Sequence, residues 1–322
     1  MSAVPEHAEA LNDAGQSADA GPDLSIEAER EVARQFMGRI QWESIVIGIG
    51  QCVVWFINWG LVLSGTLPLW AGFLIATFST AFAYLPSHEG QHGNISGRNN
   101  QWKWLDSFVG HITLIPLAQS HEVLRVTHMK HHAYTNDPQL DVDYGTRGKH
   151  WWNAALNVHR GSYASGEGKD AIAIHAERDP AFLAGLQRGI PVMKALKLAQ
   201  LIMVFLFPLE TLLLWWLPAK IALSYLAVYF SWLPHHPMQE TGRYRDTRFW
   251  QIRLPRYLDQ SMQTHVIHHL YPGIPHWDEP KAMEALKPFL IERGVPGAED
   301  IPKKVRFNPL IASSRAAGKR GK

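Results

Sequence analysis

One stretch of this sequence restricts the possible folds more than any other: residues 44–87 contain no Asp, Glu, Lys or Arg. A hydrocarbon core about 30 Å thick is crossed by about 20 apolar residues in a helix. The stretch is therefore long enough for two crossings. Its turn residues, at 64–68, lie near the middle. The pattern predicts a helical hairpin with spans at 44–63 and 68–86.

A second apolar region covers residues 198–234, where Glu210 and Lys220 are the charged side chains. It predicts a second hairpin, with spans at 197–217 and 219–234 and a turn at Pro218. Soluble helices rarely continue so far without a polar face. We therefore interpret the segments as membrane spans and not as buried helices of a soluble protein. The shorter segment 104–120 fits an interfacial or re-entrant helix better than a span.

Two hairpins place both termini and the long middle segment on one side of the membrane. That side holds nearly all the Lys and Arg, including those just before the first span, so the positive-inside rule predicts that it is cytoplasmic. We expect an all-α integral membrane protein of the bacterial inner membrane, with both termini and the site in a cytoplasmic helical cap. The expected domains are a disordered segment at 1–24, the membrane domain at 25–310 and a basic flexible tail at 311–322.

Histidine accounts for 17 of the 322 residues, and much of it is clustered. One cluster has the pattern H-x-x-x-H, and two have the pattern H-x-x-H-H. On a helix, spacings of three and four place side chains on one face, so each cluster can direct two or three imidazoles at one point. All three clusters follow a predicted span or lie in the middle segment, on the predicted cytoplasmic side. Their histidines are His88, His92, His128, His131, His132, His265, His268 and His269.

His235 and His236 end the predicted fourth span on the same side and provide at least one further candidate ligand. Nine imidazoles exceed the three or four ligands of one zinc ion, and they suit two ions with four or five nitrogens each. Imidazole binds Zn, Cu, Fe and Ni, so ligand type alone leaves the metal open. The isolated histidines are expected to be ordinary residues: His7, His111, His121, His150, His159, His175 and His276.

Composition excludes several other classes of protein. The single cysteine, Cys52, cannot form an internal disulfide or a cysteine-rich metal site. The near balance of 31 Lys and Arg with 29 Asp and Glu argues against a nucleic-acid partner.

Two other functions compete for the same histidines. The sequence from His88 to His92 also matches H-E-x-x-H, in which two histidines bind zinc and the glutamate is a general base. An intramembrane zinc metalloprotease is therefore an alternative, although it leaves two clusters unexplained. A metal transporter would need ligands along a path within the bilayer, and the predicted spans hold almost none.

Three histidine clusters on a four-span scaffold resemble the membrane fatty acid desaturase superfamily, over about residues 44–295. The sequences RVTHMKHHAYTNDP and HVIHHLYPGIP are similar to those of desaturase-type β-carotene hydroxylases. LPHHPMQE after the fourth span is similar too, and there the resemblance favours His235 as a ligand and leaves His236 in reserve. The chain departs from that pattern at Glu89, where many relatives have Asp, and at His236, where Arg is more usual. The departures leave the substrate open.

The resemblance implies a centre of two non-haem irons that uses O₂ and an external electron donor to oxidise a lipid. The donor would be a ferredoxin- or cytochrome-type protein with its own reductase. The reaction implied is hydroxylation of a carotenoid ring, and the alternative is introduction of a double bond into an acyl chain. A basic group of residues is a candidate dock for an acidic donor, with ordinary juxtamembrane charge as the alternative: Arg243, Arg245, Arg248, Arg253 and Arg256.

Four polar residues after the second cluster are candidates for a supporting role. Carboxylate and amide oxygens can accept hydrogen bonds from the ring N–H groups of ligand histidines and so fix their orientation. The alternative role for the same residues is turn formation around Asn136-Asp137-Pro138. The candidates are Asn136, Asp137, Asp141 and Asp143.

Overall fold

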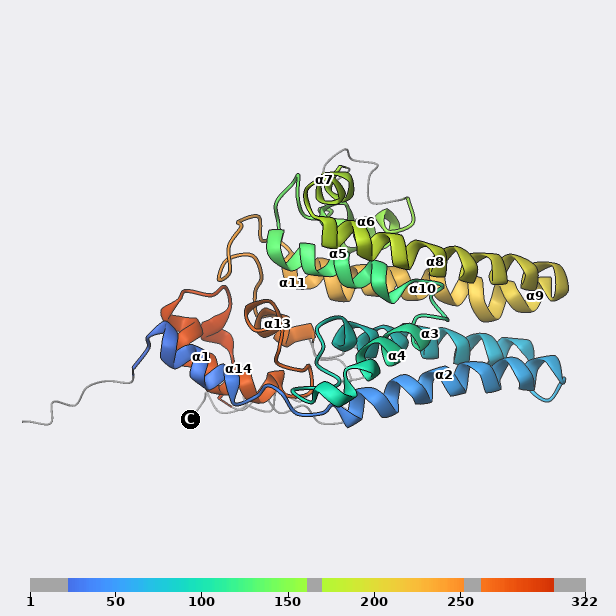
Figure 1. The fold of residues 1–322 in the computed structure, drawn as a ribbon, viewed down its shortest axis with the longest axis horizontal. Coiled ribbons are helices and arrows are strands. Elements are labelled where there is room, and N and C mark those ends of the chain that lie inside the picture. The colour runs from blue at the N-terminus through green and yellow to red at the C-terminus, as the bar shows by residue number, and fades with distance from the viewer. Residues whose placement is uncertain (1–22, 161–169, 252–261, 304–322) are drawn as a thin grey trace, which may run out of the picture.

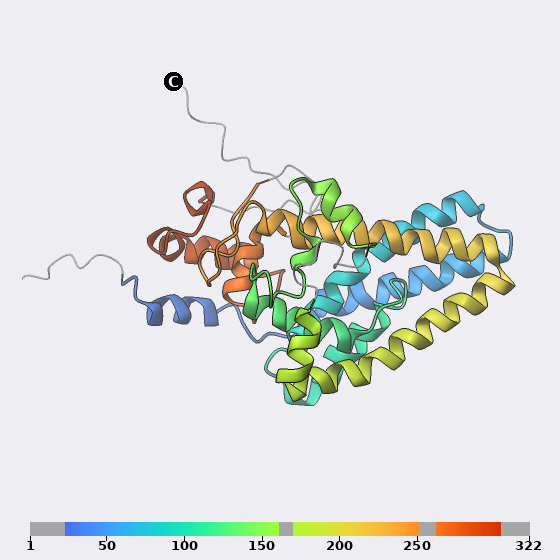
Figure 2. The same ribbon diagram turned by 90° about the horizontal axis from the view of Figure 1, so that it is seen from above.

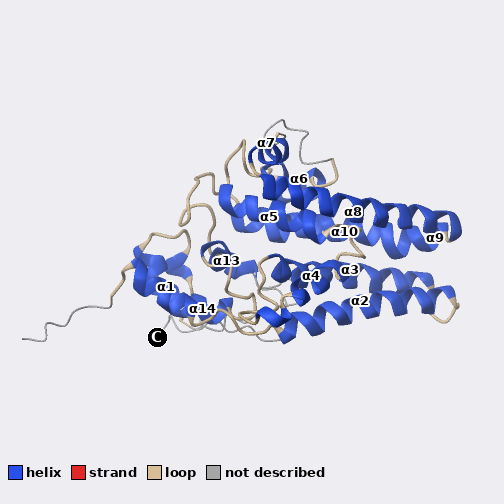
Figure 3. Ribbon diagram, viewed as in Figure 1, coloured by secondary structure: helices blue, strands red, loops and turns tan. Residues whose placement is uncertain are grey.

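A computed structural model describes residues 23–160, 170–251 and 262–303, and within these ranges the chain forms helices and no strand (Figure 3). The all-α prediction is confirmed. The described part contains four helices that are long and apolar enough to cross a membrane: Trp42–Leu63, Leu69–Gln91, Pro180–Leu206 and Pro208–His235. The predictions for the extreme N-terminus and for the tail 311–322 lie outside the described residues, as do Arg253 and Arg256.

The first hairpin has the predicted shape. Helix α2 (Trp42–Leu63) and helix α3 (Leu69–Gln91) are joined by a short turn in which Gly65 adopts a φ of 73°, a value that favours glycine. The inner face of α2 packs Trp55 and Trp59 against Leu214 of the second hairpin. Its outer face leaves apolar side chains such as Phe56 exposed, as expected for a surface that faces lipid.

The predicted turn of the second hairpin is wrong: the chain reverses at Phe207 and not at Pro218. Helix α8 (Pro180–Leu206) ends there because Pro208 disfavours a helical conformation in the residue before it, and Phe207 has φ −143° and ψ 71°. Pro218 instead lies within the fourth span, directly after the π-helical segment η3 (Leu212–Trp216). Regular hydrogen bonding is already interrupted in such a segment, so the missing N–H of proline costs less there.

The fourth span is consequently a composite helix. It runs through α9 (Pro208–Thr211), η3, α10 (Leu217–Leu226), a second π-helical segment η4 (Ala227–Trp232) and α11 (Leu233–His235). The third span begins well before the predicted residue 197, because Asp179 caps the N-terminus of α8 by accepting hydrogen bonds from Ala181 and Phe182.

The remaining helices form a cap at the end of the spans opposite the two hairpin turns (Figures 1 and 2). The segment 104–120 contains a helix of only nine residues, α4, which is too short to span a bilayer. The cap consists of α1 (Ile26–Arg34), η1 (Asn100–Trp102), α4 (Trp104–Ile112), α5 (His121–Tyr134), η2 (Tyr144–Thr146), α6 (Trp151–Asn157), α7 (Ala171–Arg178), η5 (Met262–Thr264), α13 (His265–Leu270), α14 (Glu279–Glu292) and η6 (Ala298–Asp300).

The cap has its own apolar core, which fixes the third histidine cluster. Val266 and Ile267 of α13 are fully buried against Met283 and Leu286 of α14. Glu29 of α1 is also fully buried, and it accepts hydrogen bonds from the hydroxyl groups of Tyr271 (2.7 Å) and Tyr244 (3.0 Å). Helix α1 is thereby attached to the segment that follows α13. Because the apolar side of α13 packs against α14, its histidines lie on the side that faces the spans.

Candidate metal centre

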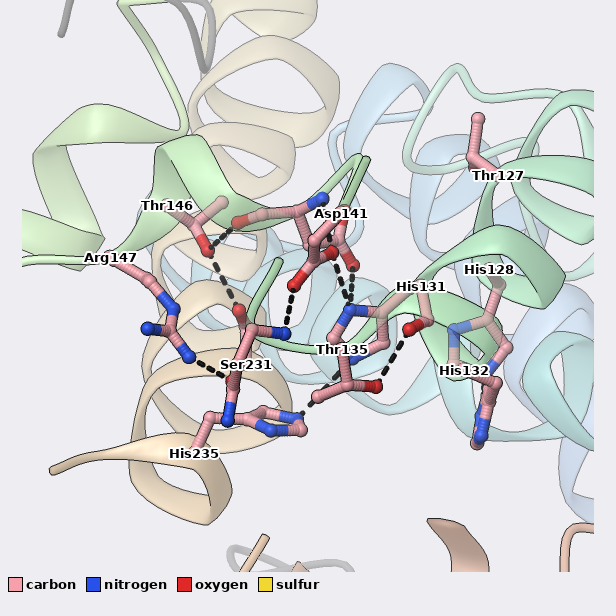
Figure 4. Close-up of polar contacts among 12 residues, drawn as sticks. Thr127, His128, His131, His132, Thr135, Asp141, Thr146, Arg147, Ser231 and His235 are labelled. Carbon is pink, nitrogen blue, oxygen red and sulfur yellow. Dashed lines mark hydrogen bonds and ion pairs between the residues drawn. The ribbon is translucent and has the colours of Figure 1, made fainter. Parts of the chain in front are cut away.

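The nine histidines proposed as ligands converge from four parts of the fold. His88 lies in the last turn of α3, and His92 ends that helix. Helix α5 carries three histidines on one side, as its 3- and 4-residue spacings predict. Four more come from α11 and from α13. Figure 4 shows the side chains of α5 together with His235 of α11.

Five of these residues form a first group. The Nε2 atom of His128 lies 2.9 Å from that of His92 and 3.0 Å from that of His132. His132 in turn lies 3.0 Å from His268, again between Nε2 atoms. The ring of His88 completes the group, with its centroid 4.5 Å from the rings of both His128 and His268. One nitrogen from each of the five lies within 4.8 Å of the others.

The other four residues form a second group beside the first. The Nε2 atoms of His131 and His235 are 3.3 Å apart, and a nitrogen of His269 lies within 4.8 Å of both. His265 joins through His269, with their Nε2 atoms 3.2 Å apart. The nine nitrogens are thus divided into five and four.

These distances fit metal ions held by imidazole. Two ligands at right angles on bonds of about 2.1 Å are about 3.0 Å apart, which is close to the separations in both groups. Several buried ring nitrogens also have no hydrogen-bond partner within the described residues, including both nitrogens of His88. A buried polar atom without a partner costs free energy, and a bound metal would remove that cost.

Electrostatics keep most of these rings in the form that binds a metal. Burial lowers the pKa of His92 to about 3, and repulsion from His276 contributes. Burial and the neighbouring imidazoles lower the pKa of five further rings well below the ordinary value: His128, His132, His265, His268 and His269. These six rings are neutral at neutral pH, and each can offer a lone pair.

His131 differs because a carboxylate supports it. Its Nδ1 atom lies 2.8 Å from Oδ1 of Asp141, and both side chains are buried. Burial is the largest single effect and lowers the pKa of His131. The charge and hydrogen bond of Asp141, together with the charges of Asp143 and Asp246, outweigh burial and raise the pKa to about 9. The Asp141 carboxylate also accepts a hydrogen bond from the backbone N–H of Asn136. Of the four supporting candidates, Asp141 is the one in direct contact with a ligand candidate.

The other three candidates occupy different positions. Asp143 lies 3.9 Å from Nδ1 of His131, too far for a hydrogen bond. The side chain of Asn136 donates to the carbonyl oxygens of Glu240 and Asp246, so it fastens the chain after α11 to α5. Asp137 accepts from the backbone N–H groups of Gln139 and Leu140. Its role is turn formation, and the structure gives it no contact with a histidine.

His235 and His236 point in different directions. His235 is buried in the second group, and its Nδ1 atom lies 3.2 Å from the carbonyl oxygen of Asp246. His236 leaves the helix and stacks on Trp232, with ring centroids 4.3 Å apart. The structure therefore brings the first of the two histidines to the nine-nitrogen cluster and not the second.

The prediction that His276 is an ordinary residue is wrong. It is buried behind the first group, with its ring centroid 5.0 Å from those of both His88 and His268. Its Nδ1 atom lies 2.6 Å from Oε1 of Glu279, a fully buried carboxylate that also accepts a hydrogen bond from Thr264. Glu89 contacts the same ring at 3.2 Å. The sequence signal is the position of His276 just after the third cluster, where a reversal of the chain returns it to the site.

Two cavities adjoin the cluster. The first, of about 390 Å³, reaches His88, His128, His131 and His265. Its wall is mostly apolar and includes Tyr84, Leu117, Val123, Leu124, Val142, Val158, Ile172, Leu223, Leu226, Ala227 and Phe230. The second, of about 470 Å³, reaches His131 and His235. Its wall is about equally polar and apolar and carries the charged side chains of Arg147 and Lys149, and we call it the polar cavity.

The arginines proposed as a dock are partly engaged within the cap. Arg243 donates to the carbonyl oxygen of Leu270 (2.7 Å) and lies over the ring of Tyr271. Arg245 donates to the carbonyl oxygen of Gly294 (2.6 Å). Both arginines therefore hold loops in place, in addition to any role in docking an electron donor.

Comparison with known proteins places the chain in a family. The fatty acid desaturase family model matches residues 64–298. A zeaxanthin 4-ketolase of Chlamydomonas reinhardtii is 26% identical over 247 residues, which cover 72% of this chain and 49% of the ketolase. An sn-1 oleoyl-lipid 12-desaturase of Picosynechococcus sp. is 26% identical over 69% of each chain. An sn-2 acyl-lipid omega-3 desaturase (ferredoxin) of Arabidopsis thaliana is 27% identical over 74% of this chain and 56% of its own length. The chain spans about half the length of the ketolase. Because the family model matches most of this chain, the chain belongs to the fatty acid desaturase family.

Proposed function

We propose that this protein is a membrane-bound, O₂-dependent lipid oxidoreductase with a centre of two non-haem irons, and that it hydroxylates a carotenoid ring. The observation that carries the proposal is the division of nine histidine nitrogens into groups of five and four, next to an apolar cavity of about 390 Å³. Membership of the desaturase family supports iron in place of the other metals that imidazole binds.

The residues of the chain have two tasks at this centre. The nine histidines would hold the metals: His88, His92, His128, His132 and His268 in one group, and His131, His235, His265 and His269 in the other. Asp141 orients His131, and Glu279 lies against His276 and His268 on the other side. A bound di-iron centre supplies the power to oxidise a C–H bond with O₂ and two external electrons.

The apolar cavity supports a lipid substrate. Its volume lies within the range of known ligand sites, about 300–1,000 Å³. Tyr84, Leu226 and Phe230 come from the spans, so part of the wall is formed by the membrane-spanning helices. A chain or ring held there excludes water and keeps one carbon near the histidines that reach the cavity.

Desaturation of an acyl chain is the second candidate. Removal of two hydrogens gives a double bond, whereas removal of one followed by return of OH gives an alcohol, and the same ligand set serves both. Two of the relatives described above carry names of acyl-lipid desaturases, and one that of a carotenoid ketolase. Placement of the substrate in the cavity distinguishes the two reactions.

The structure lends less support to the two remote alternatives. A zinc peptidase would use Glu89 as a base, but this side chain is fully buried against His276. A transporter would need ligands along a membrane path, whereas the candidate ligands gather where the spans meet the cap.

The electron donor would be a ferredoxin- or cytochrome-type protein with its reductase, and the name of one desaturase relative includes ferredoxin. The cap would face the cytoplasm of a bacterial inner membrane, because the arginine-rich segment before α2 is part of it. A cysteine placed at Thr66 in a Cys52→Ser background would then react with an external impermeant thiol reagent, and one at Ala285 would not.

Expression in a host that makes β-carotene, with pigments and fatty acids analysed together, tests the function. New hydroxylated carotenoid supports the main proposal. New unsaturated or hydroxylated acyl chains with unchanged pigment support the second candidate. Metal analysis of the purified protein tests the centre, with two irons expected, one zinc for a peptidase and a loosely held ion for a transporter.

A further inference from the structure

The apolar and polar cavities meet at a small set of residues. Four side chains line both of them: His131, Asp143, Thr146 and Ser231. His131 belongs to the second histidine group, so the junction lies directly beside the centre. Thr146 and Ser231 face each other there, with their hydroxyl oxygens 2.7 Å apart (Figure 4).

The hydroxyl protons at this junction can be assigned. Thr146 lies 2.8 Å from the carbonyl oxygen of Asp143, which can only accept, so Thr146 donates its single proton to it. Thr146 therefore receives the proton of Ser231. Within the described residues no other group donates to the oxygen of Ser231. This oxygen lies at the boundary between the two cavities, and its lone pairs can accept a hydrogen bond from a bound molecule.

The wall of the polar cavity favours a neutral group. It contains the acidic side chains of Asp141 and Asp143 and the basic side chains of Arg147 and Lys149. The guanidinium of Arg147 already donates to Asn136 and to the carbonyl oxygen of Met238, and it lies over the ring of Tyr144. Asp141 is paired with the ring of His131, which also lines this wall, and Asp143 remains to oppose the charge of Lys149. With Arg147 engaged, this wall suits an uncharged polar group better than a phosphate.

We propose that the junction is a subsite for a lipid alcohol: the apolar part of the lipid lies in the 390 Å³ cavity, and its hydroxyl donates to Oγ of Ser231. The inference rests on the proposed function for the identity of the reaction, but not for the binding of the alcohol. It assigns to Ser231 the discrimination between a hydroxylated lipid and the matched hydrocarbon. The hydroxylated end then lies beside His131, so oxidation takes place close to an existing oxygen substituent.

The test measures binding to the metal-free protein, so that it does not depend on catalysis. Octadecan-1-ol and octadecane are titrated into protein in nanodiscs, each against empty nanodiscs of the same lipid, and the pair β-carotene and its ring-hydroxylated derivative is treated in the same way. One hydrogen bond predicts that the wild type prefers each alcohol by about three- to tenfold. Ser231→Ala should bring the ratio close to one, with the affinity for the hydrocarbon unchanged.

Thr127→Val is the matched control. Thr127 lines the same apolar cavity, but its hydroxyl is bound to the carbonyl oxygens of Val123 and Leu124 in its own helix. Its removal should leave the preference for alcohol intact. A wild-type ratio near one, a preference that survives Ser231→Ala, or an equal loss in Thr127→Val would each overturn the subsite. A preserved ratio in a protein that oxidises no lipid after iron loading would instead contradict the proposed function and leave the subsite supported.

Discussion

The Nδ1 atom of His131 lies 2.8 Å from Oδ1 of Asp141, and the Nε2 atom of the same ring lies 3.3 Å from Nε2 of His235. One ring therefore connects a buried carboxylate to the second group of nitrogens. A carboxylate that accepts from Nδ1–H leaves the lone pair of Nε2 for a metal and holds the ring in that orientation. Asp141 also accepts a hydrogen bond from the backbone N–H of Asn136. The carboxylate that orients the ring is therefore itself held by the turn after α5.

Asp141→Asn should weaken metal binding in the second group. Loss of such a supporting carboxylate typically lowers metal affinity by about 10- to 100-fold. After dialysis against increasing concentrations of a chelator, the variant should therefore lose one of its two irons before the wild type does. Mass spectrometry measures the iron content. Asp137→Asn is the control, because Asp137 contacts the backbone of its own turn. Equal retention of iron in both variants would contradict the role of Asp141.

The same pair predicts how pH affects the metal-free protein. Folding raises the pKa of His131 from 6.5 to about 9, because the charge and hydrogen bond of Asp141, with the charges of Asp143 and Asp246, outweigh burial. The resulting stability is fully present below about pH 6.5 and is lost as pH rises through about 9. The melting temperature of metal-free protein should fall across that interval. Asp141→Asn should flatten this slope, and an unchanged slope would show that the pair does not cause it.

His235→Ala and His236→Ala should have different effects although the residues are adjacent. The first removes a nitrogen 3.3 Å from His131 in the second group, whereas the second removes a ring stacked on Trp232. We expect His235→Ala to lose about half of the bound iron and all activity, and His236→Ala to keep two irons. Both proteins should still insert in the membrane. Two irons in His235→Ala would remove this residue from the ligand set.

The parts of the fold that follow from local pattern could be predicted from the sequence. The first hairpin is uncharged and has one turn signal, and the structure places its helices within a few residues of the prediction. The second hairpin has two prolines near its middle, Pro208 and Pro218, and local rules do not say which one breaks the helix. The π-helical segment before Pro218 makes the difference, and it depends on how the whole span packs.

In the site too, some features follow from local sequence pattern and others depend on how the chain packs. Helical spacing predicts that His128, His131 and His132 act together, because it describes one face of one helix. It cannot predict that His276 and Glu279 return to the first group, since a non-helical reversal after α13 brings them there. For Asp137 and Asp141, four residues apart, only the packed turn determines which one contacts His131.

Glu89→Gln should distinguish the oxidoreductase from a zinc peptidase. Glu89 contacts His276 behind the first group and is not one of the nine histidines proposed as ligands. The variant keeps its shape, so we expect two irons and lipid oxidation within about tenfold of wild type. A peptidase that lost its general base would be slowed by about 10²- to 10⁴-fold. Lipid turnover and iron content, measured on the same preparation, decide between them.

Ala227→Phe should block the substrate cavity without affecting the metals. Ala227 is buried in segment η4 and lines the apolar cavity, and a phenyl ring there occupies space that the lipid needs. Such overpacking costs about 1–3 kcal/mol of stability, so the protein should still insert and hold two irons.

The specificity constant kcat/KM for the lipid should fall at least about tenfold, since the reacting carbon can no longer approach the cluster. Leu206→Phe at an exposed position of α8 adds a ring to the outer surface and should leave kcat/KM unchanged. Normal turnover in Ala227→Phe would mean that the lipid reaches the histidines by another route. A parallel loss in Leu206→Phe would point to membrane insertion and not to the cavity.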